Sequence, residues 1–457
     1  MLTSLRIQNF KSWVDTGPVR LAPLTVIFGG NSAGKSSLGH LLLALKQTAL
    51  SSDRKRALDL GDSTTAIDLG TFADCLHGHD LGRKLQFELS WQMQPPLKVE
   101  DVLKPQVRFT GTSLALESTI MADPKTEQPR TEGFRYTLSG SGTSLEVSLL
   151  SERNSFELTA SPFELVRARG RPPALEAPEK FYRLSEASIA RFQNAGFLTD
   201  FALATEAALR RIAYLGPLRE APQRTYQWSG NTPEDVGQTG RYAVAALLAA
   251  DAERRQFTTP GKKSRQSLSE LIATQLQQLG IIERFTVKPV AEGQRDYQLL
   301  VRTGATDTEV KITDVGFGVS QVLPALVQAF YCPPNSTVWM EQPEIHLHPQ
   351  VQAELADVFI RAVQARENGK PRKVQLVVES HSEHFLNRLQ RRIAEQEIDA
   401  EDVAIYFAGR KSGQPALEPL RLNKFGDIEN WPEKFFGNDM EDLTARAVAA
   451  AKREAAE

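Results

Sequence analysis

The stretch Gly29-Gly30-Asn31-Ser32-Ala33-Gly34-Lys35-Ser36-Ser37 decides the fold, because it fits the phosphate-loop pattern Gly-x-x-x-x-Gly-Lys-Ser. The apolar run 24–28 before it predicts a buried strand, and the run 38–46 after it predicts a helix with an apolar face. In such a strand–loop–helix unit, backbone N–H groups and the helix N-terminus surround a polyphosphate. The sequence therefore predicts that this chain binds a nucleoside triphosphate.

The chemistry of the loop suggests ATP and Mg²⁺ as cofactors. Lys35 is expected to neutralise the β- and γ-phosphates, and the hydroxyl of Ser36 is expected to bind Mg²⁺. The residues expected to line the phosphates are Gly30, Asn31, Ser32, Ala33, Gly34, Lys35, Ser36 and Ser37.

Composition narrows the class of protein. Apolar residues make up 41% of the chain and charged residues 24%, which is ordinary for a soluble globular protein. The net charge of −2 gives no global attraction to nucleic acid, so any such surface has to be a local patch. Two distant cysteines, no signal pattern and no membrane-length apolar run together predict a cytoplasmic protein without a membrane segment.

Two later strands end in residues that can act on a triphosphate. The run 336–340 predicts a strand ending at Glu341, which would hold Mg²⁺ beside the phosphate-loop strand. The run 374–378 predicts another strand, with His381 just beyond its end. The order of phosphate loop, acid-ended strand and histidine is what an ABC-type ATPase needs, with the histidine contacting the γ-phosphate.

The segment 314–321 predicts a second anion site. It reads Asp-Val-Gly-Phe-Gly-Val-Ser-Gln and leads into an expected helix over 322–330, and small residues at a helix N-terminus can bind an anion. In ABC-type ATPases such an element binds the γ-phosphate of ATP held by the other subunit. The alternative interpretation is a tight turn that caps a core helix.

Together these motifs resemble one family, the ABC-type ATPases related to the chromosome-maintenance and break-repair ATPases. The resembling branch is that of the overcoming-lysogenization-defect proteins and bacterial anti-phage systems. The resemblance covers residues 1–85 and 205–437, and the ending 426–437 resembles a C-terminal element of an uncharacterised clade in that branch. The motifs that carry it are Asn9-Phe10-Lys11, 29–37, Tyr214 to Glu220, Gly316 to Gln321, Glu341 to Pro349 and Glu379 to Glu383.

The resemblance implies roles for residues outside the loop. Lys11 would reach the phosphates, Glu341 would support Mg²⁺, and His381 would be the switch histidine. The element acting in trans would be Gly316, Gly318, Ser320 and Gln321. The glutamine of the usual Q-loop cannot be identified among its candidates Gln86, Gln92 and Gln94.

One position departs from the family. The residue after the metal-supporting acid is commonly a glutamate that deprotonates the attacking water, and here it is Gln342. An amide can orient a water but cannot accept its proton at neutral pH. Either Glu344 takes that role or hydrolysis is slow, and we favour slow hydrolysis.

The expected fold is α/β: a P-loop NTPase of the ABC-ATPase type with an antiparallel β-sheet subdomain and a helical insertion. Residues 1–85 and 300–437 would form the ATPase core, and 86–165 the antiparallel subdomain. Residues 180–299 would form a helical insertion with returning strands, and 438–457 a C-terminal helix.

The expected function is a nucleotide-gated switch. The chain would form a homodimer or higher homo-oligomer around ATP and hold or release an effector, a nuclease from a neighbouring gene, in phage defence. The alternatives are a DNA-binding repair or maintenance ATPase, an ATP-binding scaffold with little hydrolysis and, more weakly, a small-molecule kinase. The chain itself shows no TOPRIM nuclease pattern after Glu383 and no sustained heptads for a coiled-coil arm.

Two further patterns leave alternatives open. A metal site other than that of Mg²⁺ would draw on the histidines His346, His348, His381 and His384. Contact with a DNA backbone would use the basic clusters 54–56 and Arg388, Arg391 and Arg392, which read equally well as solvated helix faces.

Overall fold

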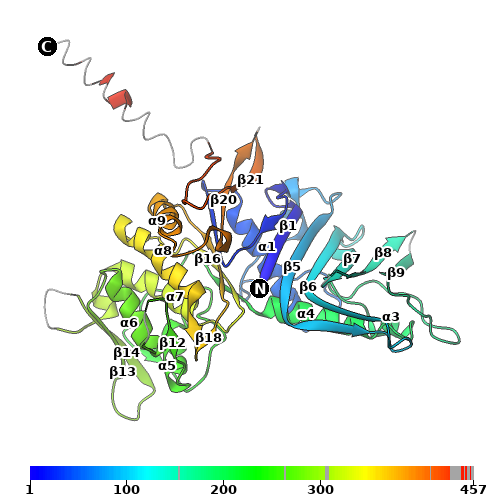
Figure 1. Ribbon diagram of the computed structural model, residues 1–457, viewed down its shortest axis with the longest axis horizontal. Coiled ribbons are helices and arrows are strands. Elements are labelled where there is room, and N and C mark those ends of the chain that lie inside the picture. Colours follow the sequence, from blue (N-terminus) through cyan, green and yellow to red (C-terminus); the bar gives the residue numbers. More distant parts are fainter. Residues whose placement is uncertain are drawn as a thin grey trace.

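The computed structural model places two sheets and their helices in an elongated arrangement (Figure 1). It describes residues 1–140, 142–152, 155–261, 264–303, 308–411, 413–432, 444–446, 448–449 and 453. The antiparallel strands β5 to β9 lie at one end of the molecule, and α5, α6 and the strands β13 and β14 lie at the other. The phosphate-loop unit lies between these ends.

A six-stranded sheet forms the centre. Its order is β10 (Ile212–Leu215), β16 (Thr337–Glu341), β19 (Gln375–Glu379), β4 (Leu24–Gly29), β20 (Val403–Lys411) and β21 (Gln414–Leu420). All neighbours are parallel except β20 and β21. Strands β4, β16 and β19 are almost wholly buried, as a parallel sheet covered on both faces requires.

One expectation about this sheet is wrong. The strand that ends at Glu341 does not lie beside the phosphate-loop strand, because β19 is inserted between β16 and β4. The strand next to β4 instead ends at Glu379, whose register partner on β16 is Glu341. The sequence alone does not give this strand order, because the order depends on where each connection between parallel strands places the next strand in the sheet.

The second large sheet is antiparallel. Its order is β2 (Trp13–Asp15), β1 (Leu2–Phe10), β5 (Leu85–Glu100), β6 (Arg108–Ala122), β7 (Pro129–Ser139), β8 (Ser144–Glu152) and β9 (Ser155–Ser161), with β3 (Val19–Arg20) paired to β1. The expected antiparallel texture and the β7–β8 hairpin are present. The sheet does not begin at the expected boundary near residue 85, because the N-terminal strands β1 to β3 also belong to it.

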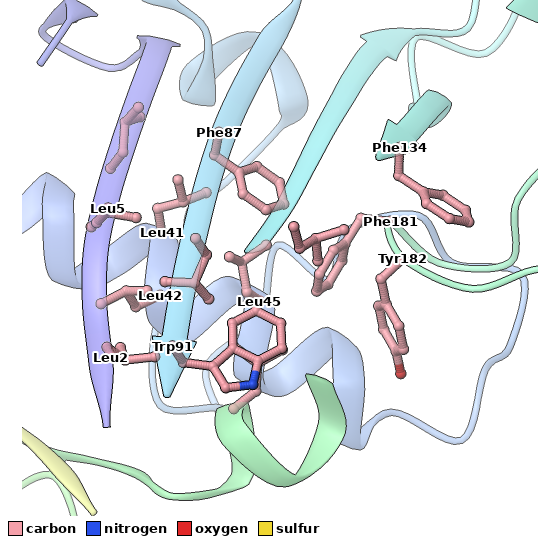
Figure 2. Packing of buried hydrophobic residues seen from close by; sticks show 14 of the residues in the cluster. Leu2, Leu5, Leu41, Leu42, Leu45, Phe87, Trp91, Phe134, Phe181 and Tyr182 are labelled. Atoms are coloured by element: carbon pink, nitrogen blue, oxygen red, sulfur yellow. The ribbon is translucent and has the colours of Figure 1, made fainter. Parts of the chain in front are cut away.

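The helices divide between two apolar cores. Helix α1 (Lys35–Leu50), α3 (Glu186–Ala190) and α4 (Phe197–Arg210) are on the side of the antiparallel sheet, where the short α2 (Phe72–Cys75) also lies. Figure 2 shows Leu41, Leu42 and Leu45 of α1 facing Leu2 and Leu5 of β1 and Phe87 and Trp91 of β5. This packing fixes the helix that follows the phosphate loop against the antiparallel sheet.

The second core covers the opposite face of the parallel sheet. It contains α5 (Ala243–Ala252), α6 (Leu268–Gln278), α7 (Phe317–Tyr331), α8 (Pro349–Gln364) and α9 (Glu383–Ala394). Alternation along β4 produces the division, because Ile27 packs into the first core while Val26 and Phe28 pack into the second.

Two small sheets complete this side. One contains β11 (Tyr226–Gln227), β14 (Asp296–Arg302), β13 (Arg284–Pro289) and β15 (Val310–Lys311), and the other β12 (Phe257–Thr258), β17 (Arg366–Glu367) and β18 (Lys370–Pro371). Short 3₁₀ turns occur at η1 (His77–His79), η2 (Ile312–Asp314) and η3 (Ala400–Asp402). The expected insertion 180–299 is therefore not one unit, since α4 joins the first core, β10 joins the parallel sheet and α6 joins the second core.

The C-terminal expectations are tested only in part. Phe435, Phe436 and Gly437 lie outside the described residues, as does most of the expected helix 438–457, of which 444–446 and 448–449 are helical. Within the part of the chain that the structure describes, no helix has both the length and the apolar character that a membrane span requires.

Candidate functional site

The phosphate loop turns sharply between β4 and α1, and glycine makes both turns. Gly29 has φ 143°, and a Cβ there would lie 2.1 Å from the carbonyl oxygen of Ala408. Gly34 has φ 89°, and a Cβ there would lie 2.2 Å from the Ser12 hydroxyl. Helix α1 begins directly at Lys35, so its free N–H groups open into the loop, as phosphate binding requires.

The loop encloses a cavity of about 350 Å³. Most of the residues expected to hold ATP lie around it, although they come from distant parts of the sequence. The lining is Lys11, Ser12, Asn31, Ser32, Ala33, Gly34, Lys35, Ser36, Ser37, His40, Gln342, Glu379 and His381. Three segments thus meet as expected: the loop, the residue after β16 and the residues at the end of β19.

Lys35 lies at the centre of the loop. Its ammonium donates to the carbonyl oxygens of Gly29 and Gly30, both at 2.9 Å, and lies 3.2 Å from Nε2 of His381. Burial lowers the pKa of Lys35, and burial together with the Lys35 charge lowers the pKa of His381. The histidine is therefore held neutral beside the lysine and can accept or donate a hydrogen bond there.

Two carboxylates converge on the hydroxyl of Ser36. Its Oγ lies 3.0 Å from Oε2 of Glu341 and 2.8 Å from Oε2 of Glu379. Carboxylate and hydroxyl oxygens are the ligands that Mg²⁺ prefers, so this donor set is suited to the cation. Burial and the nearby Glu341 charge raise the pKa of Glu379. Burial also acts to raise the pKa of Glu341, but hydrogen bonds from His40, Tyr214 and Ser36 outweigh it, and the pKa is lowered.

Glu341 is oriented by two side chains that carried no assigned role. The hydroxyl of Tyr214 donates to Oε1 of Glu341 at 2.7 Å, and Nε2 of His40 lies 3.6 Å from the same oxygen. His40 also connects to the expected phosphate ligand Lys11, because its Nδ1 lies 3.4 Å from the Lys11 ammonium. Desolvation lowers the pKa of Lys11, which has φ 48° at the end of β1.

Gln342 and Glu344 have different surroundings. Gln342 lines the phosphate cavity, has φ 45°, and donates its backbone N–H to the carbonyl oxygen of Glu379 at 2.8 Å. Glu344 is buried outside that lining, where it accepts from the Ser380 hydroxyl at 2.8 Å and the His381 N–H at 2.7 Å. Glu344 therefore contacts the loop that carries His381 through Oε1, while its Oε2 is buried without a hydrogen-bond partner among the described residues, and its role as a base on the attacking water stays a prediction.

The element 316–321 does not line the phosphate cavity of its own chain. Gly316 is exposed and caps α7, whereas Ser320 and Gln321 are buried, at 7% and 3% exposure. A Cβ on Gly318 would lie 3.3 Å from the carbonyl oxygen of His346. This loop can therefore present the N–H groups at the start of α7 to a facing anion, whereas the side chains of Ser320 and Gln321 point into the protein.

The candidate Q-loop glutamines lie elsewhere. Gln86 bonds to Thr119 on β6, and Gln94 accepts from Lys373. Gln92 and Gln94 both line a separate cavity of about 530 Å³. The start of β16 also lines this cavity, which lies at the end of the parallel strands opposite the phosphate loop. None of the three is among the residues of the phosphate cavity.

The basic clusters are largely neutralised by neighbouring carboxylates. Arg388 and Arg392 both contact Asp357, at 2.8 and 2.7 Å, and Arg391 contacts Glu395 at 2.7 Å. Arg54 and Arg56 face Glu186 and Asp59, at 3.4 and 2.9 Å. These pairs favour the interpretation as solvated faces over that of a phosphate-backbone surface.

The histidine pattern does not assemble a further metal centre in the described residues. No group of three or more His, Cys, Asp or Glu side chains there could hold a metal ion. Nδ1 of His348 instead accepts from the N–H of Gln350 at 3.4 Å and caps α8.

Some site residues could not be identified from the sequence. His40 and Trp339 carry no local signal, and Glu379 has no role assigned from the sequence although it begins the resembling motif Glu379 to Glu383. These roles depend on the register of neighbouring strands and on the face of α1. Tyr214 belongs to the resembling motif Tyr214 to Glu220. The same motif supplies Arg219, and its Nη2 donates to the carbonyl oxygen of Glu341 at 3.1 Å. A buried strand ending in a glutamate was the one available hint for Glu379.

Comparisons with known proteins match two segments. Residues 253–386 match the AAA_15 family, described as an AAA ATPase domain, and 398–445 match DUF3696, described as a protein of unknown function. No curated protein matches the chain. The first match includes the segments of Glu341 and His381 but not the phosphate loop.

Solved structures similar to this chain include three SMC head domains. The SMC head bound to the C-winged helix domain of ScpA is 11% identical, with 92% of this chain and 98% of that chain covered and a TM-score of 0.43. The SMC head domain from Thermotoga maritima is 10% identical, with 92% and 99% covered and a TM-score of 0.38. The SMC head with an extended coiled coil bound to the C-terminal domain of ScpA, derived from Pyrococcus furiosus, is 11% identical, with 92% and 96% covered and a TM-score of 0.36.

The mixed α/β fold, with its phosphate-loop strand and helix and its antiparallel sheet, is consistent with a P-loop ATPase of the ABC type, as the sequence predicted. The phosphate loop on β4, the acid at the end of β16 and the AAA ATPase match all support this assignment. The placement in the overcoming-lysogenization-defect branch stays a prediction.

Proposed function

We propose that this chain binds ATP with Mg²⁺ and hydrolyses it as the ATPase subunit of a nucleotide-gated dimeric switch. The observation that carries the proposal is one cavity in which Lys35, Ser36, Gln342 and His381 meet. A cation bound by Ser36 and the neighbouring carboxylates would neutralise phosphate charge and orient the terminal phosphate. Lys35 and the helix N-terminus would hold the remaining phosphate oxygens.

The dimer follows from what the cavity lacks on its open side. The start of α7 is not among the residues that line the phosphate cavity of its own chain, although its N–H groups could bind an anion. A second copy placed head to tail could bring its Gly316 and the α7 N-terminus to the exposed phosphate. Nucleotide would then join the two chains, and its loss would release them.

Gln342 supports slow turnover. Gln342 lines the phosphate cavity and its amide cannot take a proton from water, whereas Glu344 lies outside that lining with one oxygen bonded to the His381 loop. The same residue favours a second candidate function, an ATP-binding scaffold with little hydrolysis. Single-turnover hydrolysis separates the two, because the scaffold would leave bound ATP intact where the switch converts it slowly.

We further propose that the switch holds or releases a protein effector, a nuclease encoded by a neighbouring gene, in phage defence. This part rests on the resemblance to anti-phage ATPases alone. Co-purification of the native complex from cells that express the wild type or Lys35→Ala tests it. A nuclease that is recovered with the wild type and lost with the variant supports the proposal, and recovery of none contradicts it.

The ATP site is tested by nucleotide affinity. Lys35→Ala removes the central cation of the loop and should weaken binding of a fluorescent ATP analogue by about 10²-fold or more. Lys125→Ala, an exposed lysine in the turn between β6 and β7, is the matched control and should bind as the wild type does. Equal affinity of wild type and Lys35→Ala would contradict the site.

A further inference from the structure

Glu379 is a buried carboxylate at the end of a central strand, beside the phosphate loop. It is the last residue of β19, between the phosphate-loop strand and the strand that ends at Glu341. Its register partners are Ile27 on β4 and Glu341 on β16, so the two carboxylates stand level at the same edge of the sheet. Glu379 is only 1% exposed, and a buried carboxylate is costly unless specific donors or a cation satisfy it.

The protein supplies donors that fix the direction of this carboxylate. The indole N–H of Trp339 donates to Oε1 of Glu379 at 2.7 Å, and the Ser36 hydroxyl lies 2.8 Å from Oε2. Trp339 is itself 1% exposed, and α1 makes room for its ring at Gly39, where a Cβ would lie 2.5 Å from the indole. Three elements, α1, β16 and β19, are therefore shaped around one carboxylate.

Two carboxylate oxygens face the hydroxyl of Ser36, which has only one proton to donate. Ser36 carries one O–H, yet Oε2 of Glu341 and Oε2 of Glu379 both lie within hydrogen-bond distance of its Oγ. Two carboxylates and a hydroxyl form the oxygen-rich set that binds a hard divalent cation together with phosphate oxygens. No group of three or more His, Cys, Asp or Glu side chains among the described residues could hold a metal ion, so phosphate or water oxygens would complete the coordination.

We infer that Glu379 is a second acidic residue of the divalent-cation site and that Trp339 is its positioning residue. The inference rests on the proposed function, since the cation is the one that accompanies ATP. Glu341 and Glu379 would face the metal from neighbouring strands, directly or through water. The indole N–H keeps the second carboxylate pointing at Ser36.

The test measures metal affinity rather than turnover. Mn²⁺ is titrated into the full chain with a non-hydrolysable ATP analogue, and free Mn²⁺ is followed by its electron paramagnetic resonance signal. Glu379→Gln should weaken Mn²⁺ binding at least about tenfold, the effect expected when a residue that supports a metal is removed. Binding of the analogue in EDTA, where no metal takes part, should stay as in the wild type.

Two tryptophan variants separate positioning from packing. Trp339→Phe keeps an aromatic ring, although a smaller one, but removes the N–H that orients Glu379, and should weaken Mn²⁺ binding about threefold to tenfold. Trp91→Phe is the matched control, because Trp91 is also buried while its Nε1 has no hydrogen-bond partner in the structure. It should leave the Mn²⁺ affinity unchanged.

The outcomes are distinguishable. Wild-type Mn²⁺ affinity in Glu379→Gln overturns the inference while leaving ATP binding intact. Equal effects of Trp339→Phe and Trp91→Phe overturn the role of Trp339. If Glu379→Gln does not fold, as judged by circular dichroism, Trp339→Phe decides alone, and wild-type affinity in that variant overturns the inference. A wild-type chain that binds no nucleotide contradicts the proposed function instead.

Discussion

At the scale of single residues, the chemistry of the site turns on Gln342. It follows the acid-ended strand, its φ is 45°, and its side chain lines the phosphate cavity. The one nearby carboxylate in the same turn, Glu344, is bonded to Ser380 and His381 instead. An amide in this place can hold a water but cannot itself accept the proton.

Restoring a carboxylate at this position should accelerate hydrolysis. Gln342→Glu should raise the steady-state rate of phosphate release by about 10²-fold, the effect of adding a positioned general base. Gln414→Glu, the same chemical change on the exposed edge strand β21, should leave the rate unchanged. A wild type that already turns over rapidly, with no gain in Gln342→Glu, would show that the slow-switch account is wrong.

Residues of the site differ in how far they could be predicted. Lys35 and Ser36 follow from local spacing, because the loop pattern has the same geometry wherever a strand and a helix flank it. Glu379 could not be predicted, because its role arises from pairing with Glu341 across two strands. The buried side chains of Ser320 and Gln321 show the converse, since a motif does not reveal which of its side chains face inward.

At the scale of elements, the contact between α1 and β16 positions the site. Gly39 lets the helix approach the Trp339 ring, and that ring is bonded to Glu379. The same helix carries Ser36 and His40, which face Glu341. A small displacement of α1 would therefore separate the hydroxyl from both carboxylates.

A methyl group at this contact should destabilise the protein. In Gly39→Ala, overpacking against the indole costs about 1–3 kcal/mol and outweighs the helix-propensity gain of about 1 kcal/mol, because the bonded ring cannot turn away. Thermal unfolding should show a lower midpoint, and the smaller ring of Trp339→Phe should recover part of the loss in the double variant. A raised midpoint in Gly39→Ala would mean that the helix and strand are not in tight contact.

At the scale of the whole molecule, the two cores meet across the parallel sheet, and the phosphate loop lies at the edge that they share. Strand positions were largely predictable, because alternation and buried runs are local. The order of strands and the division into units were not. Strands β1 to β3 belong to the antiparallel sheet through the pairing of β1 with β5, which is distant in sequence, and the segment 180–299 is split between cores.

The central claim is that ATP joins two copies of this chain, each supplying half of the pocket. An exposed Gly316 with open space around its Cβ provides a variant that spares the fold: Gly316→Glu places a negative charge where the facing phosphate would lie, and Gly316→Ala is its neutral control. Gly316→Ala should bind nucleotide as the wild type does, and Gly316→Glu should still bind it through the phosphate loop of its own chain. Only the control should dimerise, because like charges repel.

The most direct test is the mass of the protein in solution with Mg²⁺ and a non-hydrolysable ATP analogue, measured by analytical ultracentrifugation. The account predicts that the mass of the wild type and Gly316→Ala doubles with nucleotide, while Lys35→Ala and Gly316→Glu keep the mass of a single chain. A wild type that binds the nucleotide and remains a single chain would contradict it, as would equal dimerisation of all four proteins.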